Sequence, residues 1–190
     1  GIKIPADEFK IPTSNRAFRF GDGVFETMKM ARGKVLFFLH HYSRLIYGMD
    51  ALKMDIPEEY TPIFFLQAID KLAQANNIAT GRIRLHSYRA GEGLYNPEHN
   101  HPEFLIETSS IDDVYYEINK EGWHVGIYNE MPKVIAETAK YKTGNSLPFV
   151  LASIHKKEKN WDDCLLLNTN GEIAEATSSN IFIFKEGKLQ

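Results

Sequence analysis

The stretch of sequence that decides the fold of this chain runs from residue 142 to residue 184. It begins Lys142-Thr143-Gly144-Asn145-Ser146-Leu147-Pro148, and an apolar pattern of helical spacing follows. Asn145 or Ser146 can cap that helix, and the proline suits its first turn. Lys142 therefore stands just before the positive end of a helix dipole, which disfavours an ammonium and favours the free amine.

The same stretch ends in a predicted hairpin that carries a carboxylate. Asn170-Gly171 is a turn pair typical of hairpin loops, and the chain continues Glu172-Ile173-Ala174-Glu175-Ala176-Thr177-Ser178-Ser179-Asn180-Ile181-Phe182-Ile183-Phe184. Ile173, Glu175 and Thr177 share one face of the second strand. An amine that readily loses its proton and a carboxylate on a rigid strand form a pair suited to carbonyl chemistry.

The composition is that of a globular protein with a sizeable core. Apolar residues make up 43% of the 190 residues and aromatic residues 12%, which argues against disorder and suits one large or two small domains. The net charge of -3 and the scattered Lys and Arg residues predict no nucleic-acid partner. The longest apolar run, near residues 35–39, is too short for a membrane span. A single cysteine, Cys164, and the absence of a signal-peptide pattern at the first residues predict a cytoplasmic protein.

Hydrophobic periodicity predicts strands and helices along the whole chain. Apolar residues recur at helical spacing over residues 40–53, 62–76 and 146–158. Strand-like runs cover residues 24–30, 35–38, 82–88, 103–108, 123–128 and 164–167, besides the hairpin after residue 170. Within residues 82–88 the apolar residues face one side of the strand, and Arg82, Arg84 and His86 face the other.

A polar, acidic stretch divides the chain. Residues 110–120 are weakly periodic and are predicted to link an N-terminal α/β domain, residues 1–109, to a C-terminal β-rich domain, residues 121–190. Residues 184–190 read as a strand, a turn and the beginning of a return strand, which would leave an open sheet edge. The C-terminal domain is therefore expected to be incomplete.

Four short motifs resemble those of the class IV pyridoxal-phosphate enzymes. They are Arg16-Ala17-Phe18-Arg19-Phe20-Gly21-Asp22-Gly23-Val24-Phe25-Glu26-Thr27, His40-His41-Tyr42-Ser43-Arg44-Leu45, Lys142-Thr143-Gly144-Asn145 and the segment 168–180. That family contains branched-chain aminotransferases, D-amino-acid aminotransferases and aminodeoxychorismate lyases. Each motif alone is weak, but four in the right order, spread from Arg16 to Phe184, are specific.

The resemblance implies a cofactor, pyridoxal 5′-phosphate (PLP), and a role for each motif. Lys142 would form a Schiff base with the cofactor aldehyde and move protons at the substrate Cα. Glu175 would hydrogen-bond the pyridine nitrogen and keep it protonated, and Arg44 would pair with the phosphate. The remaining cofactor residues would be Ser178, Ser179 and Asn180, and by family position the substrate residues would be Phe25, Arg89 and Tyr95.

The same resemblance implies the fold and the assembly. The expected fold is the two-domain, D-amino-acid-aminotransferase-like PLP fold type IV, an α/β (α+β) architecture. It combines an N-terminal α/β sandwich with a C-terminal β pseudo-barrel, which looks truncated here, and the cofactor lies between them. Members are commonly homodimers, so a homodimer is expected, with an amino acid and a 2-oxo acid as small-molecule substrates and no membrane partner.

Three functions remain open at this point. The first is an aminotransferase that moves an amino group between an amino acid and a 2-oxo acid. The second is 4-amino-4-deoxychorismate lyase, which releases pyruvate and 4-aminobenzoate. Branched-chain aminotransferases usually carry glycine where this chain has Thr27, so this position is closer to the lyase and D-amino-acid branches. The third is a cofactor-free remnant with a binding role, because the family's second phosphate loop would lie beyond Gln190.

Taken singly, these residues would indicate no function. An isolated lysine is usually a solvated surface residue, and Lys140 competes with Lys142 until the spacing to Asn145 selects Lys142. His99 and His101 lie in a loop without cysteine partners, so we expect no metal site.

Overall fold

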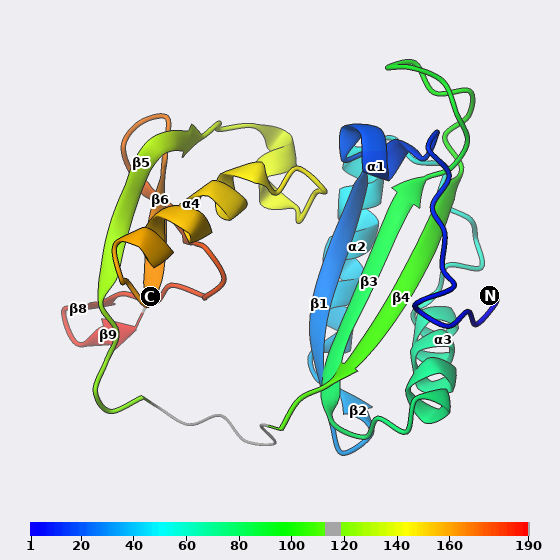
Figure 1. Cartoon of the computed structure of the whole chain (residues 1–190), viewed down its shortest axis with the longest axis horizontal. Helices are drawn as coiled ribbons and strands as arrows, with labels where there is room; N and C mark the ends of the chain where they lie inside the picture. Colours follow the sequence, from blue (N-terminus) through cyan, green and yellow to red (C-terminus); the bar gives the residue numbers. More distant parts are fainter. Residues whose placement is uncertain (113–118, 190) are drawn as a thin grey trace. The chain divides into compact units, whose positions relative to one another are not determined.

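A nine-residue strand, β1 (Gly23–Ala31), lies inside the sheet of the first unit of the protein. The structure is a computed structural model, and it describes residues 1–112 and 119–189. β1 pairs antiparallel with β3 (Gly81–Arg89) along its length and with the short β2 (Lys34–Val35) at its end. β4 (Pro102–Ser110) pairs with β3, so the strand order is β2-β1-β3-β4 (Figure 1).

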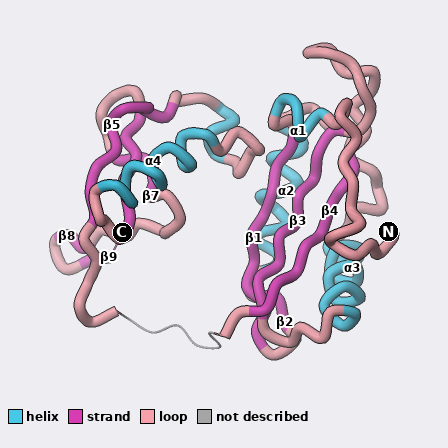
Figure 2. The backbone as a smooth tube through the Cα atoms, in the orientation of Figure 1, coloured by secondary structure: helices cyan, strands magenta, loops and turns pink. Residues whose placement is uncertain are grey.

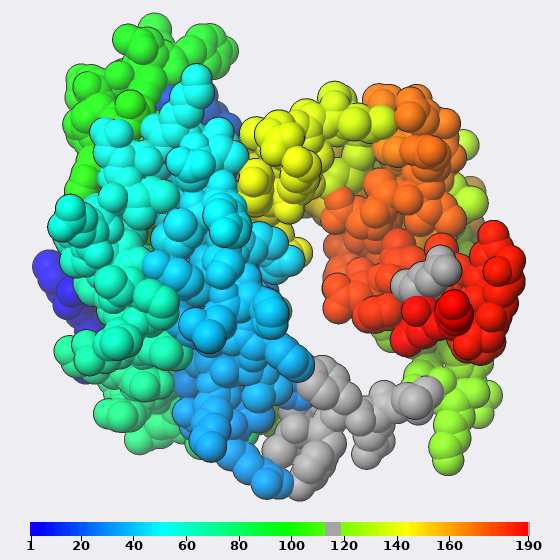
Figure 3. Space-filling view, turned by 180° about the vertical axis from the view of Figure 1, so that it is seen from behind, coloured from blue at the N-terminus to red at the C-terminus, as the bar shows by residue number. Residues whose placement is uncertain are grey.

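Two helices cover one face of this sheet. They are α2 (Phe38–Ala51) and α3 (Pro62–Ala75), and both lie on the near side of the unit in Figure 3. Alternate residues of β1 and β3 point towards them, as the period of two requires. The shared core includes the fully buried residues Met28, Met30, Leu45, Met49, Phe65, Ile69, Ile83 and Leu85. The opposite sheet face carries Phe25, Thr27, Arg84 and His86.

The second unit is smaller and mixes parallel and antiparallel strands. β5 (Val125–Lys133) and β6 (Asp163–Asn168) are parallel, and β7 (Ile173–Ala176) pairs antiparallel with β6. Figure 2 shows β5 and β7 as strands in magenta. Between β5 and β6 the chain forms a short 3-10 helix, η1 (Glu137–Lys140), and α4 (Leu147–Glu158). Its core contains Tyr128, Ala152, Cys164 and Leu166. The last strands, β8 (Phe184–Lys185) and β9 (Lys188–Leu189), form a separate hairpin.

Most predicted elements are confirmed, and four details differ. The strand predicted over residues 123–128 begins at Val125 and continues to Lys133 as β5. A short helix, α1 (Arg16–Phe20), precedes β1 and was not predicted; Asn15 caps it by accepting from Phe18 N–H at 3.0 Å. The predicted strand over residues 35–38 is shorter, because Phe37 adopts a left-handed φ of 53° and α2 begins at the next residue. Ser146 occupies the N-cap of α4 but makes no side-chain cap hydrogen bond.

The chain divides into two compact units by its contacts. The first comprises Gly1–Tyr116 with Lys140–Gly144, and the second comprises Glu117–Ala139 with Asn145–Gln190. The predicted linker, residues 110–120, falls largely on residues 113–118, which lie outside the described residues, so its boundaries stay a prediction. Within the described ranges, every helix is too short or too polar to cross a membrane.

Candidate functional site

Lys142 lies in a short segment that pairs with β1 in the first unit. The Lys142 carbonyl accepts a hydrogen bond from Phe25 N–H at 2.8 Å, and Gly144 N–H donates to the Gly23 carbonyl at 2.9 Å. An antiparallel bridge to β1 lies between these two bonds. The bonds use the edge of β1 away from β3, so the backbone of the lysine is held as a strand would be.

Glycine at position 144 allows this close approach. A Cβ built on Gly144 would lie 2.8 Å from the Gly21 carbonyl oxygen. Because real Cβ atoms do not approach a backbone oxygen so closely, any side chain here would push the two segments apart. The close approach of the two segments therefore explains why the third residue of Lys142-Thr143-Gly144 is glycine.

The sheet face opposite the helices brings two nitrogen groups to one aromatic ring. Lys142 Nζ lies 5.9 Å from the centroid of the Phe25 ring, and the Arg84 guanidinium carbon lies 3.9 Å from the same centroid. Burial lowers the pKa of Arg84, against the opposite effect of Glu107, whose carboxylate lies 3.7 Å away. Arginine stays charged despite such a shift, so this face places the Lys142 side chain and the Arg84 cation at the same ring.

His86 lies on the same face as a neutral imidazole. It stands opposite Phe25 in the register of β1 and β3, and the two rings meet edge-on with centroids 6.3 Å apart. Burial, assisted by the charge of Arg84, lowers the pKa of His86 to about 4. Among the described residues, its Nε2 atom is buried without a hydrogen-bond partner. At neutral pH the His86 side chain is therefore uncharged, and it affects this face through the packing of its ring against Phe25.

Arg44 is held by a buried carboxylate of β1. Its Nε and Nη2 atoms each lie 2.5 Å from an oxygen of Glu26, and His41 Nδ1 lies 2.7 Å from the same carboxylate. Burial alone would raise the pKa of Glu26, but the hydrogen bonds from Arg44 and His41 outweigh it and lower the pKa. The Arg44 side chain is 41% exposed, and within the described part of the chain its Nη1 donates to no protein group. Arg44 can therefore still offer one guanidinium edge to an anion.

Two predicted substrate residues, Arg89 and Tyr95, have contrasting environments. Arg89 donates to Asp22 at 3.0 Å, to Asn100 at 2.6 Å and to two backbone carbonyls just after α2 at 2.5 Å and 3.2 Å. Tyr95 is 90% exposed, and its ring packs against Phe20 at a centroid distance of 5.5 Å. The guanidinium of Arg89 is thus largely used inside the protein, whereas Tyr95 is accessible.

In the second unit, Glu175 keeps part of its carboxylate accessible. It lies on β7, its side chain is 37% exposed, and it forms an ion pair with Lys133 of β5. Lys133 also lies over the Phe149 ring, with Nζ 4.7 Å from the centroid. Since a carboxylate has about four acceptor positions, Glu175 retains capacity for a ligand.

The predicted cofactor residues after Glu175 fall into two groups. Ser178 and Asn180 are exposed, whereas Ser179 Oγ donates to the buried Asp163 carboxylate at 2.6 Å. Thr177 Oγ1 donates to the same carboxylate. Burial would raise the pKa of Asp163, but the hydrogen bonds lower it. Asp163 was not found from the sequence, because an acidic residue at the start of a strand belongs to no motif.

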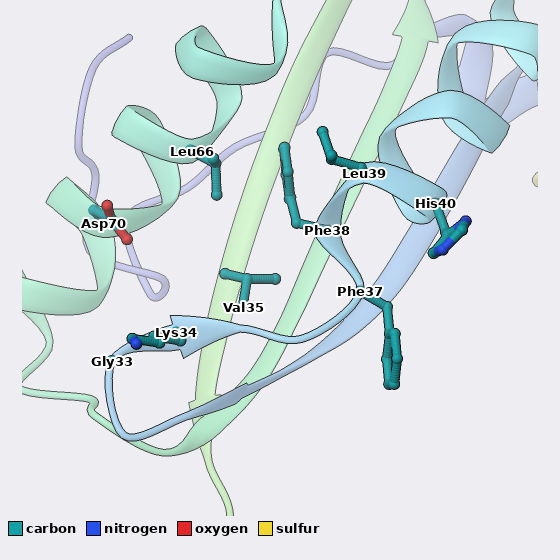
Figure 4. Close-up of a pocket in the computed structure, with 9 residues that line it drawn as sticks. All are labelled: Gly33, Lys34, Val35, Phe37, Phe38, Leu39, His40, Leu66 and Asp70. Carbon is teal, nitrogen blue, oxygen red and sulfur yellow. The ribbon is translucent and has the colours of Figure 1, made fainter.

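An open groove of about 630 Å³ in the first unit contains none of the predicted site residues. Its walls are mainly apolar, with Val35, Phe38 and Leu66 facing one another and Asp70 at one end (Figure 4). Among the described residues, His, Cys, Asp and Glu side chains form no group of three that could hold a metal ion.

A family model for class IV aminotransferases matches residues 23–190. The chain belongs to the class IV aminotransferase family. It is 28% identical to a probable branched-chain-amino-acid aminotransferase of Rickettsia felis over 195 residues, which cover 100% of this chain and 64% of that protein. It is 25% identical to an aminodeoxychorismate lyase of Vibrio harveyi, with 94% of this chain and 65% of that protein covered. The chain thus spans just under two thirds of the length of these relatives.

A solved aminotransferase structure shares the fold. The crystal structure of a branched-chain aminotransferase from the archaeon Thermoproteus uzoniensis, determined with norvaline, has a TM-score of 0.84 and 20% sequence identity. The similarity covers 98% of this chain and 64% of that one. This confirms the predicted fold class.

The class IV match includes every site residue predicted from the sequence, since the first of them is Phe25 and the last is Asn180. Their individual roles stay predictions. Arg84 was not among them, although the alternation of Arg82, Arg84 and His86 along one strand placed it on the face where it is found. The sequence did not show that the aromatic ring in contact with Arg84 is that of Phe25.

Proposed function

We propose that this protein is a PLP-dependent aminotransferase that moves an amino group between an amino acid and a 2-oxo acid. One observation carries the proposal: the backbone of Lys142 is bonded to a sheet edge, and its amine lies against the Phe25 ring that Arg84 also contacts. Such chemistry needs a primary amine at a fixed position and a cation for the substrate carboxylate. Membership of the class IV family supports this choice.

The donor set fits the cofactor. Lys142 supplies an amine for the aldehyde, and the accessible edge of Arg44 suits a phosphate. Glu175 offers a partly exposed carboxylate to a ring N–H, and the exposed Ser178 and Asn180 add neutral hydrogen-bonding groups. An amine, a guanidinium and a carboxylate match in turn the aldehyde, the phosphate and the pyridine nitrogen of PLP.

Each group then has a separate task. When bound, PLP supplies the electron sink that stabilises negative charge at the substrate Cα. Lys142 Nζ removes the proton from that Cα as general base and delivers a proton as general acid. Glu175 keeps a proton on the pyridine nitrogen, and Arg84 orients the substrate carboxylate. The neutral His86 packs beside the Phe25 ring and adds no competing charge.

The test is covalent trapping of PLP on the protein. After addition of PLP and then borohydride, peptide mass spectrometry should find the cofactor on Lys142, and the absorbance band of the bound cofactor should disappear. Lys142→Ala should lose the adduct and lower turnover by on the order of a thousandfold or more. Lys140→Ala, two residues earlier, is the matched control and should retain both.

The substrate then separates the transaminase from the lyase. Thr27 and the lyase among the relatives favour the second candidate, an aminodeoxychorismate lyase. Amino acids with a 2-oxo acid should give amino-group transfer if the first proposal holds. Release of pyruvate from aminodeoxychorismate, with no transfer of an amino group from an amino acid to a 2-oxo acid, would favour the lyase. A protein that traps no PLP would instead be a cofactor-free binding protein.

We further infer a homodimer in the cytoplasm, as the resemblance implies. Sedimentation velocity measures the first part, and cell fractionation measures the second. A monomer at micromolar concentration would contradict the dimer.

A further inference from the structure

Three charged residues of the first unit, Arg16, Asp22 and Arg89, form an almost buried cluster. Arg16 Nε and Arg89 Nε lie 2.8 Å and 3.0 Å from the same oxygen of Asp22, Oδ2. The two arginines are only 3% and 7% exposed. Because a buried charge is tolerated only when it is paired and hydrogen-bonded, this geometry is tightly constrained.

The two arginines connect separate chain segments to Asp22. Arg16 Nη1 donates to the Leu94 carbonyl at 2.6 Å, which holds the loop between β3 and β4. Arg89 donates to Asn100 Oδ1 at 2.6 Å and to two backbone carbonyls just after α2 at 2.5 Å and 3.2 Å. The cluster therefore joins α1, the end of α2, the end of β3 and the following loop at one carboxylate.

Asp22 stands between the two glycines against which the lysine segment is packed. The Gly23 carbonyl accepts the Gly144 N–H at 2.9 Å, and the Gly21 carbonyl oxygen is the atom that a Cβ on Gly144 would strike. Gly21 has a left-handed φ of 65°, and its carbonyl accepts the Gly23 N–H at 2.8 Å. Glycines are conformationally permissive, so a fixed side chain between them is what holds this turn in one shape.

We propose that Asp22, Arg16 and Arg89 are positioning residues for Lys142. They hold the turn from Gly21 to Gly23, and the segment that pairs with this turn carries the lysine. They thereby set where the amine lies relative to the Phe25 ring. In this role Arg89 acts through the backbone, with its guanidinium donating to Asp22, Asn100 and two backbone carbonyls. The inference rests on the proposed role of Lys142.

The test compares variants by the rate at which Lys142 is modified. Borohydride trapping after mixing with PLP, followed by peptide mass spectrometry, gives this rate, with the exposed Lys71 of α3 as internal reference. Asp22→Asn and Arg89→Lys are each expected to slow trapping at Lys142 about tenfold, because a small misplacement of a reacting group is costly. Arg89→Lys keeps the positive charge but loses the planar guanidinium, which donates to several partners at once. Because the charge is kept, it should perturb folding less than Asp22→Asn. Lys71 should react at the wild-type rate.

Tyr42→Phe is the matched control for stability. It removes a hydrogen bond from Tyr42 Oη to the Tyr60 carbonyl, 2.9 Å long, in the same unit but away from the cluster. It should lower the unfolding midpoint and leave trapping at Lys142 unchanged. If Asp22→Asn or Arg89→Lys traps as fast as Tyr42→Phe, the cluster only stabilises the fold and the inference is overturned.

A second readout needs no cofactor. Trinitrobenzenesulfonate labels accessible amines, and the fraction of label on Lys142 relative to Lys71 should change in Asp22→Asn and Arg89→Lys but not in Tyr42→Phe. A wild-type protein that forms no PLP adduct at Lys142 would contradict the proposed function alone. Labelling that is identical in all four proteins would contradict the positioning role.

Discussion

Two strand carboxylates, Glu26 in the first unit and Glu175 in the second, have different surroundings. Glu26 is buried, and Arg44 and His41 together occupy both of its oxygens. Glu175 is partly exposed and pairs with Lys133. The first carboxylate is saturated and organises its neighbours, whereas the second can still accept a hydrogen bond from a ligand. The two carboxylates are of the same residue type. What separates the structural role of Glu26 from the ligand-accepting role proposed for Glu175 is how far protein hydrogen bonds and burial already occupy the carboxylate.

The arginines of the first unit show the same distinction. Arg89 uses its guanidinium on a carboxylate, an amide oxygen and two carbonyls, although its family position suggested a substrate contact. Arg84 lies over the Phe25 ring with a partner 3.7 Å away, which leaves its donors accessible. A residue-type search finds both arginines, and only the hydrogen-bond network tells them apart.

The largest effect is expected where a saturated carboxylate loses its main partner. Arg44→Met leaves the buried Glu26 with His41 alone and should cost about 3 kcal/mol of unfolding free energy at pH 7. The pKa of Glu26 is lowered in the folded protein, so its stabilisation is present above the ordinary value of 4.5 and is lost as pH falls. In Arg44→Met, the unfolding free energy of the first unit should therefore fall much less with decreasing pH than in the wild-type protein. Hydrogen exchange of β1 and β3 amides measures the first unit, because both tryptophans lie in the second.

Arg82→Met is the control for this measurement. Arg82 is an exposed arginine on β3, and its replacement should change the stability by less than about 0.5 kcal/mol. Equal losses in the two variants would show that Glu26 does not depend on Arg44.

The next effect concerns the buried imidazole of His86. Its pKa is about 4 in the folded protein against an ordinary value of 6.5, so the unfolded chain binds the proton first as the pH falls. The first unit should therefore lose about 2 kcal/mol of stability between pH 7 and pH 5 from this group. His86→Leu should flatten that part of the pH profile in hydrogen exchange. An unchanged slope would mean that the imidazole is protonated in the folded protein.

In the second unit, the saturated carboxylate is Asp163. Asp163→Asn weakens the hydrogen bonds from Thr177 and Ser179 and should cost about 1.5 kcal/mol. The pKa of Asp163 is lowered in the fold, so this contribution is present above 3.8 and fades as pH falls below it. Trp161, which packs against the core of this unit, reports the change by fluorescence. A loss of unfolding free energy as large as that of Arg44→Met would contradict the expectation that Glu26 with Arg44 contributes more stability to its unit than Asp163 contributes to the second unit.

The sequence predicted the elements better than the contacts between them. Alternation along β3 and the helical spacing of α2 and α3 depend on local burial, and both are confirmed. The pairing of Lys142 with β1 joins residues more than 100 positions apart, and no local pattern encodes it. The left-handed Phe37 likewise interrupts a run that reads as a strand. Motif order located the candidate lysine, and only the fold shows what holds it.

Glu175→Gln is expected to have the smallest effect on stability and a large effect on chemistry. The pair with Lys133 is partly exposed, so its loss should change the unfolding free energy of the second unit by less than about 1 kcal/mol. A glutamine cannot keep the pyridine nitrogen protonated, so the half-reaction with an amino acid should slow by on the order of a hundredfold. Stopped-flow absorbance of the PLP-loaded protein measures this rate.

Asp163→Asn provides the comparison that decides the meaning of that result. It disturbs the same segment, through Thr177 and Ser179, but leaves the Glu175 carboxylate in place. If saturation marks the structural carboxylate, Asp163→Asn lowers stability more than Glu175→Gln and slows the half-reaction less. The reverse order would mean that Glu175 serves the fold through Lys133, and that the ligand-facing group of this unit must be sought at Ser178 or Asn180.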